Sequence, residues 1–512
     1  MGKTRDDQSD TVAFLSNPKS YGVDAPVKVH QTHGSFVFLA GEHAYKLKRA
    51  VKFPYMDYST PDRRREMCEH ELVVNKRMAP ALYESVRSVV KDRAGWHLGS
   101  PDDDNAVDWV VVMRRFDQAD LFEERRKAGR LDNSHMFDLA AVIAEFHRGA
   151  PTSHSFGGAA GIRGVVDENV DILQSIALEL SPESQISTYA ALSDSCLRNL
   201  RSILGLRRQT GFVRRCHGDL HLNNICMFGG KPTLFDAIEF ADSFSYIDVM
   251  YDLAFTLMDL DFHGMRGHAN ALLNRYLECT GDYAGLATLP LFLASRAAIR
   301  AHVAIASQGA TSNLAAARLL ESAIAYLRPD EPQLIVVGGL SGTGKSVLAR
   351  SMAQAVGRCP GAVVLRSDVI RKAMFDVPQH QPLDEGAYSR SASAEVYDRL
   401  IGIAATTLRS GHSVIADAVF GHYSERRRIE TLALDAGVKL HAIWLTAPRN
   451  VLEERIAHRR GDVSDATVKV LAEQLATVSV PDHWRKISAV GAISTVLAEA
   501  EKSIASASEL AI

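Results

Sequence analysis

The stretch Gly339-Leu340-Ser341-Gly342-Thr343-Gly344-Lys345-Ser346 decides the fold of the second half of this chain. It matches the pattern G-x-x-x-x-G-K-[ST], follows the apolar run LIVV at 334–337 and leads into a helical stretch, VLARSMAQAV. In this setting the backbone N–H groups of a glycine-rich turn wrap phosphates, Lys345 reaches the β and γ phosphates, and the Ser346 hydroxyl ligates Mg²⁺. The stretch therefore predicts a nucleotide-binding loop between a strand and a helix.

Downstream of this loop, strand-like runs alternate with helical stretches. The runs are LIVV (334–337), VVL (363–365), SVIA (413–416) and HAIWL (441–445). This rhythm is typical of βαβ units and predicts an α/β half with a parallel sheet. Asp368 and Asp417 follow two of the runs, and we expect both to face the loop because ligands gather at the carboxyl ends of parallel strands. Helix N-caps are the alternative for both aspartates.

On these residues the region 333–500 resembles the small-molecule P-loop kinases, a group that includes gluconate and shikimate kinases, chloramphenicol phosphotransferase and the kinase part of polynucleotide kinases. The resemblance implies that Asp368 activates the acceptor hydroxyl and that Asp417 helps to hold Mg²⁺ through water. It also implies a lid at 453–462, where Arg455 and Arg459 neutralise charge on the transferring phosphoryl group. A solvated basic helix face is the alternative for these two arginines.

A second pattern that carries chemistry lies in RCHGDLHLNN (215–224) and LFDAIEF (234–240). Kinase chemistry needs one carboxylate to orient the attacking hydroxyl and accept its proton, and an Asn and a second Asp to hold magnesium. Asp219, Asn224 and Asp236 stand in that order. On this set the region 28–325 resembles the aminoglycoside and choline phosphotransferases, relatives of protein kinases. The resemblance implies that Asp219 is the base and that Asn224 and Asp236 are the metal ligands.

The same resemblance implies a strand lysine for the α and β phosphates and a helix glutamate that holds it. The run AYKLK at 44–48 offers Lys46 and Lys48 on one face of a strand. The charged helix that follows offers Glu69 and Glu71. We predict that Lys46 and Glu71 form the pair, while Lys48 and Glu69 remain the alternatives.

Two further residues of this half receive structural interpretations. Asp252 opens the apolar helical stretch LAFTLMDL, and the resemblance implies that it braces the catalytic loop by hydrogen bonds. His221 is expected to point to solvent or to pack the loop. No pattern at 150–210 or 262–325 predicts the acceptor.

Length and composition set wider limits. The chain has 512 residues, 46 % of them hydrophobic, with 58 Lys+Arg against 61 Asp+Glu and a net charge of −3. This balance disfavours a dedicated binder of nucleic acid or membrane surfaces. Six cysteines without a C-x-x-C pair indicate neither a disulfide framework nor a zinc site. The polar N-terminus does not resemble a secretory signal, and the apolar stretch at 286–306 is too polar to cross a bilayer. We therefore expect a cytoplasmic protein.

The chain is predicted to divide at 329–333, where two prolines and two acidic residues precede the LIVV strand. We expect an α+β, bilobal kinase-like domain at 1–328, with a small lobe at about 1–112 and a helical lobe at about 113–328, and a P-loop domain at 334–512. Together they predict a bifunctional phosphotransferase that uses Mg-ATP on small hydroxylated acceptors, with GTP left open for the first half. The alternatives are a nucleotide-binding sensor in one half and a nucleic-acid 5′-hydroxyl kinase in the P-loop half. The oligomeric state is not predicted.

Overall fold

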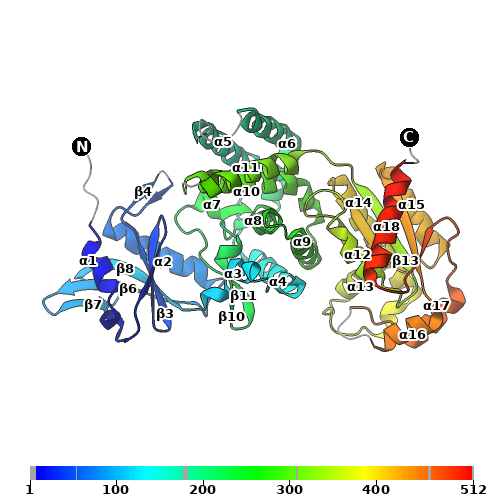
Figure 1. Ribbon diagram of the computed structural model, residues 1–512, viewed down its shortest axis with the longest axis horizontal. Helices are drawn as coiled ribbons and strands as arrows, with labels where there is room; N and C mark the ends of the chain where they lie inside the picture. The colour runs from blue at the N-terminus through cyan, green and yellow to red at the C-terminus, as the bar shows by residue number, and fades with distance from the viewer. Residues whose placement is uncertain (1–6, 54, 177–182, 307–309, 459–462, 510–512) are drawn as a thin grey trace. The chain divides into compact units, whose positions relative to one another are not determined.

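The computed structural model describes residues 7–53, 55–176, 183–306, 310–458 and 463–509 (Figure 1). By its internal contacts the chain forms two compact units. One combines residues 1–168 with 201–259, and the other combines 169–200 with 260–512. The helices after residue 260 therefore group with the P-loop half, whereas the sequence pattern places the division at 329–333. The domain boundaries stay a prediction.

A six-stranded antiparallel sheet forms the small lobe of the first unit. Its order is β1 (Lys28–Gln31), β2 (Ser35–Ala40), β3 (His43–Lys48), β8 (Ala106–Arg114), β6 (Tyr83–Asp92) and β7 (Gly95–Gly99). Helix α2 (Pro61–Lys76) packs against β6 and β8. Its N-cap, Thr60, accepts a hydrogen bond from the Arg63 amide, which satisfies one of the free N–H groups of the first turn. The sheet and α2 position the lysine and glutamate of the first candidate site.

The rest of the first unit is mainly helical and carries two short antiparallel strand pairs. Strand β9 (Val213–Arg215) pairs with β12 (Tyr246–Asp248), and β10 (Ile225–Phe228) pairs with β11 (Lys231–Leu234). Gly229 and Gly230 join β10 to β11 with φ of 58° and 78°, the conformation of a tight type I′ turn. The helices of this region include α3 (Phe122–Lys127), α4 (Asn133–Gly149), α7 (Asp242–Ser245) and α8 (Val249–Phe262). Helices α5 (Gly158–Ile176) and α6 (Glu183–Gln209) are divided between the units, because residues 169–200 group with the second unit. The predicted catalytic loop therefore runs between β9 and β10.

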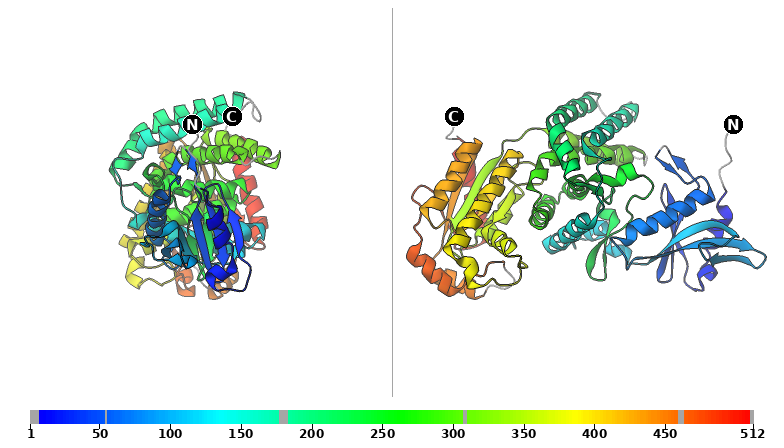
Figure 2. Two further views of the ribbon diagram at one scale, coloured as in Figure 1. Left: turned by 90° about the vertical axis from the view of Figure 1, so that its left-hand side faces the viewer. Right: turned by 180° about the vertical axis from the view of Figure 1, so that it is seen from behind.

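The second unit contains a five-stranded parallel sheet. Its order is β14 (Val363–Arg366), β15 (Val414–Asp417), β13 (Gln333–Gly339), β16 (Lys439–Thr446) and β17 (Arg485–Ser488). Helices α12 (Lys345–Ala353) and α18 (Ile493–Glu509) cover one face, and α14 (Arg390–Arg409) and α15 (Tyr423–Ala436) cover the other (Figures 1 and 2). The α/β and α+β fold classes predicted for the two halves are confirmed.

The edge strand β14 is covered by a helix instead of a further strand. Helix α9 (Arg266–Thr280) presents Asn274, whose Oδ1 accepts from the Val364 amide at 2.7 Å and whose Nδ2 donates to the Ala362 carbonyl at 3.2 Å. Asn270 donates to the same carbonyl at 3.0 Å. The Asn274 amide therefore satisfies two of the groups that a neighbouring strand would pair.

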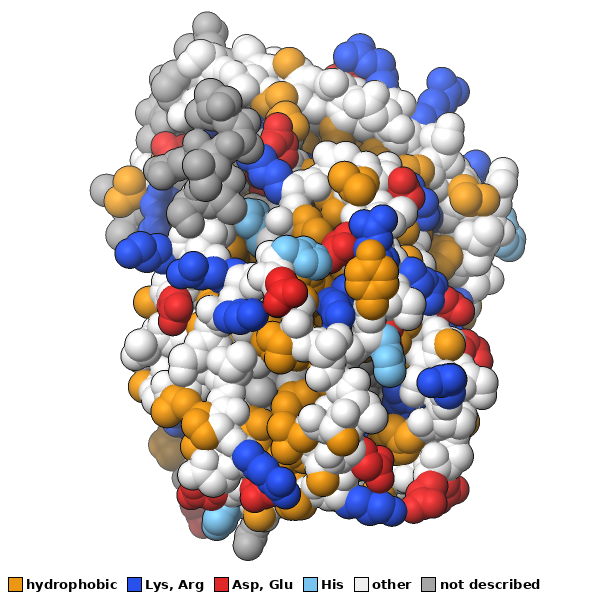
Figure 3. Space-filling view, turned by 90° about the vertical axis from the view of Figure 1, so that its right-hand side faces the viewer, with side chains coloured by type: hydrophobic (Ala, Val, Ile, Leu, Met, Phe, Trp, Pro, Cys, Tyr) orange, Lys and Arg blue, Asp and Glu red, His pale blue; other side chains and the backbone are white. Residues whose placement is uncertain are grey.

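The remaining helices of the second unit are α10 (Leu289–Ala306), α11 (Ala310–Leu327), α13 (Ser367–Met374), α16 (Arg449–Ala457) and α17 (Val468–Thr477). Across the residues that the structure describes, no helix combines the length and the apolar character needed to span a bilayer. On the face of the second unit drawn in Figure 3, the described acidic and basic side chains are interspersed.

Candidate functional site

The predicted phosphate-binding loop links β13 to α12. Gly339 has a φ of 140°, and a Cβ there would approach the Leu445 carbonyl oxygen to 2.7 Å, so the close passage of the two chains requires glycine. Gly344 is the N-cap of α12 with a φ of 88°, and Lys345 is the first helical residue. The Lys345 ammonium donates to the Leu340 carbonyl at 2.9 Å. The loop thus opens at a helix N-terminus, where free amides and the helix dipole favour an anion.

A carboxylate and a hydroxyl meet beside this loop. The Ser346 hydroxyl donates to Asp417 Oδ2 at 2.5 Å, and Arg366 Nε lies 3.6 Å from the same oxygen. Burial raises the pKa of Asp417, and the charge of Asp368 adds to this rise, while Lys345 and Arg366 oppose it. Asp368 itself lies in the first turn of α13. The structure therefore brings Asp417 to Ser346, and this pair of oxygen donors suits Mg²⁺.

One predicted residue of the lid is described and the other is not. Arg455 lies on α16, and its Nη2 donates to the Ala489 carbonyl at 2.8 Å, just beyond β17. Arg459 lies outside the described residues. The lid role of the two arginines stays a prediction.

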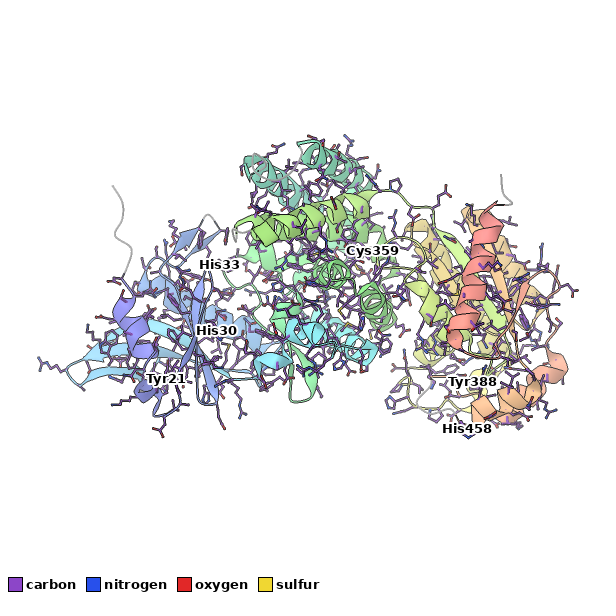
Figure 4. The ribbon with its side chains drawn as sticks, viewed as in Figure 1. Tyr21, His30, His33, Cys359, Tyr388 and His458 are labelled. Carbon is purple, nitrogen blue, oxygen red and sulfur yellow. The ribbon has the colours of Figure 1, made fainter. Side chains whose placement is uncertain are left out.

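An ion pair that the sequence patterns did not indicate lies beyond Asp368. Lys372, buried on α13, donates to Asp465 Oδ1 at 3.0 Å and to the carbonyls of Gln379 and Gln381 at 2.9 and 2.6 Å. Asp465 also accepts from the Leu383 amide at 3.0 Å and from the Tyr388 hydroxyl at 2.8 Å (Tyr388 is labelled in Figure 4). These bonds hold the segment 379–388 close to the helix that carries Asp368. The one sequence feature that could have pointed to this ion pair is that Lys372 follows Asp368 by one helical turn.

In the first unit, Asp252 holds the predicted catalytic loop. Its buried carboxylate accepts from the amides of His217 and Gly218 at 3.1 and 2.8 Å and from His147 Nε2 at 3.1 Å. Gly218 has a φ of 85°, and a Cβ there would come within 2.8 Å of the Phe244 carbonyl oxygen. These are the loop-bracing hydrogen bonds that the family resemblance implied for Asp252.

The structure brings Asp219 and Asn224 together at the end of that loop. Asn224 Nδ2 donates to the Asp219 carbonyl and to Asp219 Oδ2, both at 2.9 Å. His221 Nε2 lies 3.4 Å from Asp219 Oδ2, and its ring packs edge-on against Phe255. Asp236 lies after β11 with a φ of 63°, and its amide donates to the Tyr83 hydroxyl at 3.1 Å. Carboxylate and amide oxygens of this kind are the donors that Mg²⁺ prefers.

Both candidate lysines contact Glu71. Lys46 Nζ donates to Glu71 Oε1 at 2.8 Å and Lys48 Nζ to Oε2 at 2.7 Å. Lys46 also pairs with Asp236 and Lys48 with Glu239. The alternative Glu69 pairs instead with Arg65 at 3.0 Å on the exposed side of α2, and Glu239 was missed because no local pattern distinguishes it from other acidic residues.

Burial alone would lower the pKa of each lysine, but the neighbouring carboxylates raise both pKa values well above the ordinary value. Burial opposes ionisation of Glu71 as well, and the two ammonium groups overcome it, so its pKa is lowered. Lys46, Lys48 and Glu71 therefore form a cluster of groups that are ionised at neutral pH. It places a positive charge, Lys46, beside the metal-ligand candidate Asp236, which is the arrangement needed to bind a metal-bound polyphosphate.

Two family models match separate parts of the chain. The model of the phosphotransferase enzyme family matches residues 68–289, and that of an AAA domain matches residues 334–481. Uncharacterized proteins of Mycobacterium bovis and Mycobacterium tuberculosis are each 31 % identical over 475 residues, covering 91 % of this chain and 93 % of the relative.

Two further comparisons cover parts of the chain. An adenylyl-sulfate kinase of Myxococcus xanthus is 31 % identical over 139 residues, which are 27 % of this chain and 67 % of that kinase. The crystal structure of a choline/ethanolamine kinase family protein from Mesorhizobium loti aligns with 63 % of this chain and 98 % of its own, at 14 % identity and a TM-score of 0.38.

Proposed function

The chain belongs to the same family as the mycobacterial proteins, with an N-terminal phosphotransferase-family domain and a C-terminal P-loop kinase domain, and from this premise we propose that it is a bifunctional phosphotransferase. Each half would transfer the γ-phosphoryl group of Mg-ATP to a small hydroxylated acceptor in the cytoplasm. The observation that carries the proposal is the presence, in each unit, of a base candidate, an oxygen donor set for Mg²⁺ and a lysine placed for phosphate.

In the N-terminal half, Asp219 would orient the acceptor hydroxyl and take its proton as the O–P bond forms and the bond to the leaving ADP breaks. The hydrogen bond from Asn224 Nδ2 to Asp219 Oδ2 at 2.9 Å supports this role because it fixes the carboxylate. Asn224 and Asp236 would hold Mg²⁺ on the nucleotide phosphates, where the metal supplies neutralisation of the developing charge. Lys46, held by Glu71 at 2.8 Å, would bind the phosphates.

In the C-terminal half, the loop amides at 339–346 and Lys345 would hold the β and γ phosphates at the start of α12. Ser346 and Asp417, joined by a hydrogen bond of 2.5 Å, would hold Mg²⁺. Asp368, in the first turn of α13, would activate the acceptor hydroxyl. The charge of Asp368 contributes to the raised pKa of Asp417, which supports one site that holds both the base candidate and the metal candidates.

The test measures transfer from γ-labelled ATP to a pool of small metabolites and aminoglycosides. It compares the wild type with Lys345→Ala, Asp368→Asn and Asp219→Asn. Label on a small molecule that is lost in Lys345→Ala and Asp368→Asn but kept in Asp219→Asn assigns transfer to the P-loop half, and the reverse pattern assigns it to the N-terminal half. Label released only as inorganic phosphate in every variant, or a product that survives all three substitutions, would contradict the proposal. Competition by unlabelled GTP then identifies the nucleotide that the N-terminal half uses.

A further inference from the structure

Beside the proposed phosphate-binding lysine lies a second, deeper charge pair. The Lys48 side chain is 1 % exposed, against 12 % for Lys46. Its ammonium group lies between Glu71 Oε2 at 2.7 Å and Glu239 Oε1, and 4.8 Å from the centroid of the Tyr58 ring. The Tyr58 hydroxyl donates to the same Glu239 oxygen at 2.6 Å. Both partners of the pair are therefore removed from water.

Lys48 is enclosed by protein groups, whereas the Asp236 carboxylate, which pairs with Lys46, is 43 % exposed. A ligand in the site can reach Lys46 and Asp236, while Lys48 already has two carboxylate partners and an aromatic ring around it. Direct contact of Lys48 with nucleotide would require these buried carboxylates to give up their partner, which is costly in a low-dielectric environment. The phosphate-binding role proposed for Lys46 therefore does not extend to Lys48.

The two pairs join the same two segments of the first unit. Lys46 and Lys48 alternate along β3 and lie on one face, and Asp236 and Glu239 lie three residues apart after β11. Lys46 bonds to Asp236 and Lys48 to Glu239, while Glu71 of α2 contacts both lysines. The outer pair faces the site and the inner pair is buried behind it. Asp236 has a positive φ of 63°, so its segment needs contacts beyond its own backbone preference to stay in place.

We propose that Lys48 and Glu239 are positioning residues of the N-terminal site, whose buried ion pair fixes the segment 236–239 against β3 and so sets the spacing between Lys46 and Asp236. The inference rests on the function proposed above for this half. The net charge of the cluster does not explain why Lys48 and Glu239 are needed. Three carboxylates and two ammonium groups leave the cluster with one net negative charge, and removing Lys48 and Glu239 together leaves that net charge unchanged.

This charge balance makes the double variant Lys48→Met/Glu239→Gln informative. The single change Lys48→Met leaves Glu239 as a buried carboxylate with only Tyr58 as partner, and loss of one member of a buried pair is strongly destabilising. The double variant removes both charges, and the amide oxygen that Glu239→Gln introduces still accepts from Tyr58, so the thermal stability should recover. If the pair were purely structural, the double variant would regain nucleotide binding together with its stability. If the pair positions Asp236, the double variant regains its stability but still binds nucleotide weakly.

The experiment uses the full chain with Lys345→Ala as the parent, so that the N-terminal half supplies the remaining nucleotide site. Calorimetry gives the ATP affinity with Mg²⁺ and with EDTA, and thermal melts give the stability. We expect the double variant to melt close to the parent but to bind Mg-ATP about tenfold more weakly, and to lose most of the affinity gain that Mg²⁺ provides, because Asp236 is no longer held beside Lys46. Lys48→Arg, which keeps the charge and hydrogen bonds, should bind within about threefold of the parent.

The control is Lys91→Met/Asp10→Asn, an ion pair of the same lobe whose side chains are 52 % and 73 % exposed; it should change neither quantity. A double variant that melts and binds Mg-ATP like the parent would overturn the positioning role while leaving the proposed function intact. Normal binding by Lys46→Met together with weak binding by Lys48→Arg would also overturn it, since Lys48 would then be the phosphate ligand. A parent that binds no ATP would overturn the function of this half and the inference with it.

Discussion

His412, which follows α14, makes the stability of the second unit depend on pH. Its side chain is 0 % exposed, and its Nε2 donates to the Leu286 carbonyl at 3.1 Å. Its Nδ1 is buried without a hydrogen-bond partner among the described residues. Protonation would place a second N–H there with nothing to bond. Burial, and to a smaller extent the charge of Arg358, accordingly lower the pKa of His412 from 6.5 to about 3.

The sign and size of the effect follow from proton linkage. Below pH 6.5 the unfolded chain binds a proton at His412 that the folded chain does not bind until about pH 3, so the free energy of unfolding rises with pH across this window and is level above it. Each pH unit inside the window is worth about 1.4 kcal/mol. At pH 5 the side chain therefore costs the folded state about 2 kcal/mol relative to pH 7.

The assay is urea unfolding of the wild type and of His412→Gln at pH 7 and pH 5. Glutamine places an amide N–H near the position of Nε2 but does not titrate. Other ionisable groups affect both proteins alike, so the difference in unfolding free energy should shift by about 2 kcal/mol in favour of the variant at pH 5. His380→Gln, at an exposed position of the same unit, is the matched control substitution. An equal difference at both pH values would refute the reasoning.

Three further substitutions test other features. Asn274→Leu should lower the unfolding free energy by about 2 kcal/mol in chemical denaturation, because the buried Val364 amide loses its partner; a change below about 0.5 kcal/mol would mean that water replaces the asparagine. Asp252→Ala should lower the melting temperature and abolish transfer by the N-terminal half, because two loop amides lose their acceptor; undiminished transfer would contradict the bracing role. Gln474→Ala should tighten ATP binding at the P-loop by about threefold, because the Ser341 amide, now bonded to Gln474 Oε1 at 2.9 Å, becomes free for phosphate; weaker binding measured by calorimetry would make Gln474 a nucleotide contact instead.

The features predicted from sequence are those encoded in short segments. The loop at 339–346 combines its glycines and helix start in one stretch directly after a strand, and Asp219, Asn224 and Asp236 lie within 18 residues. Local spacing determines which of these groups share an edge or a loop. The parallel sheet and the bilobal first half followed from the same kind of information.

Features that depend on distant pairing were not predicted. Lys46 and Lys48 share one face of β3, so periodicity cannot separate them, and the structure shows that both contact Glu71. The partner of Lys48, Glu239, is 191 residues away, and Lys372 is 93 residues from Asp465. Nothing in either segment indicates such a partner, because long-range ion pairs are set by the fold and not by local preference.

The cover that α9 places over β14 also bears on self-association. An edge strand with free N–H and C=O groups is a template on which another chain can add a strand. A fragment that starts after the linker keeps β14 but loses both asparagines that bond to it. Proteolytic cleavage between α9 and β13 followed by loss of α9 would therefore expose an aggregation-prone edge. Removal of the N-terminal half is expected to reduce the solubility of the P-loop half, even where the sheet itself stays folded.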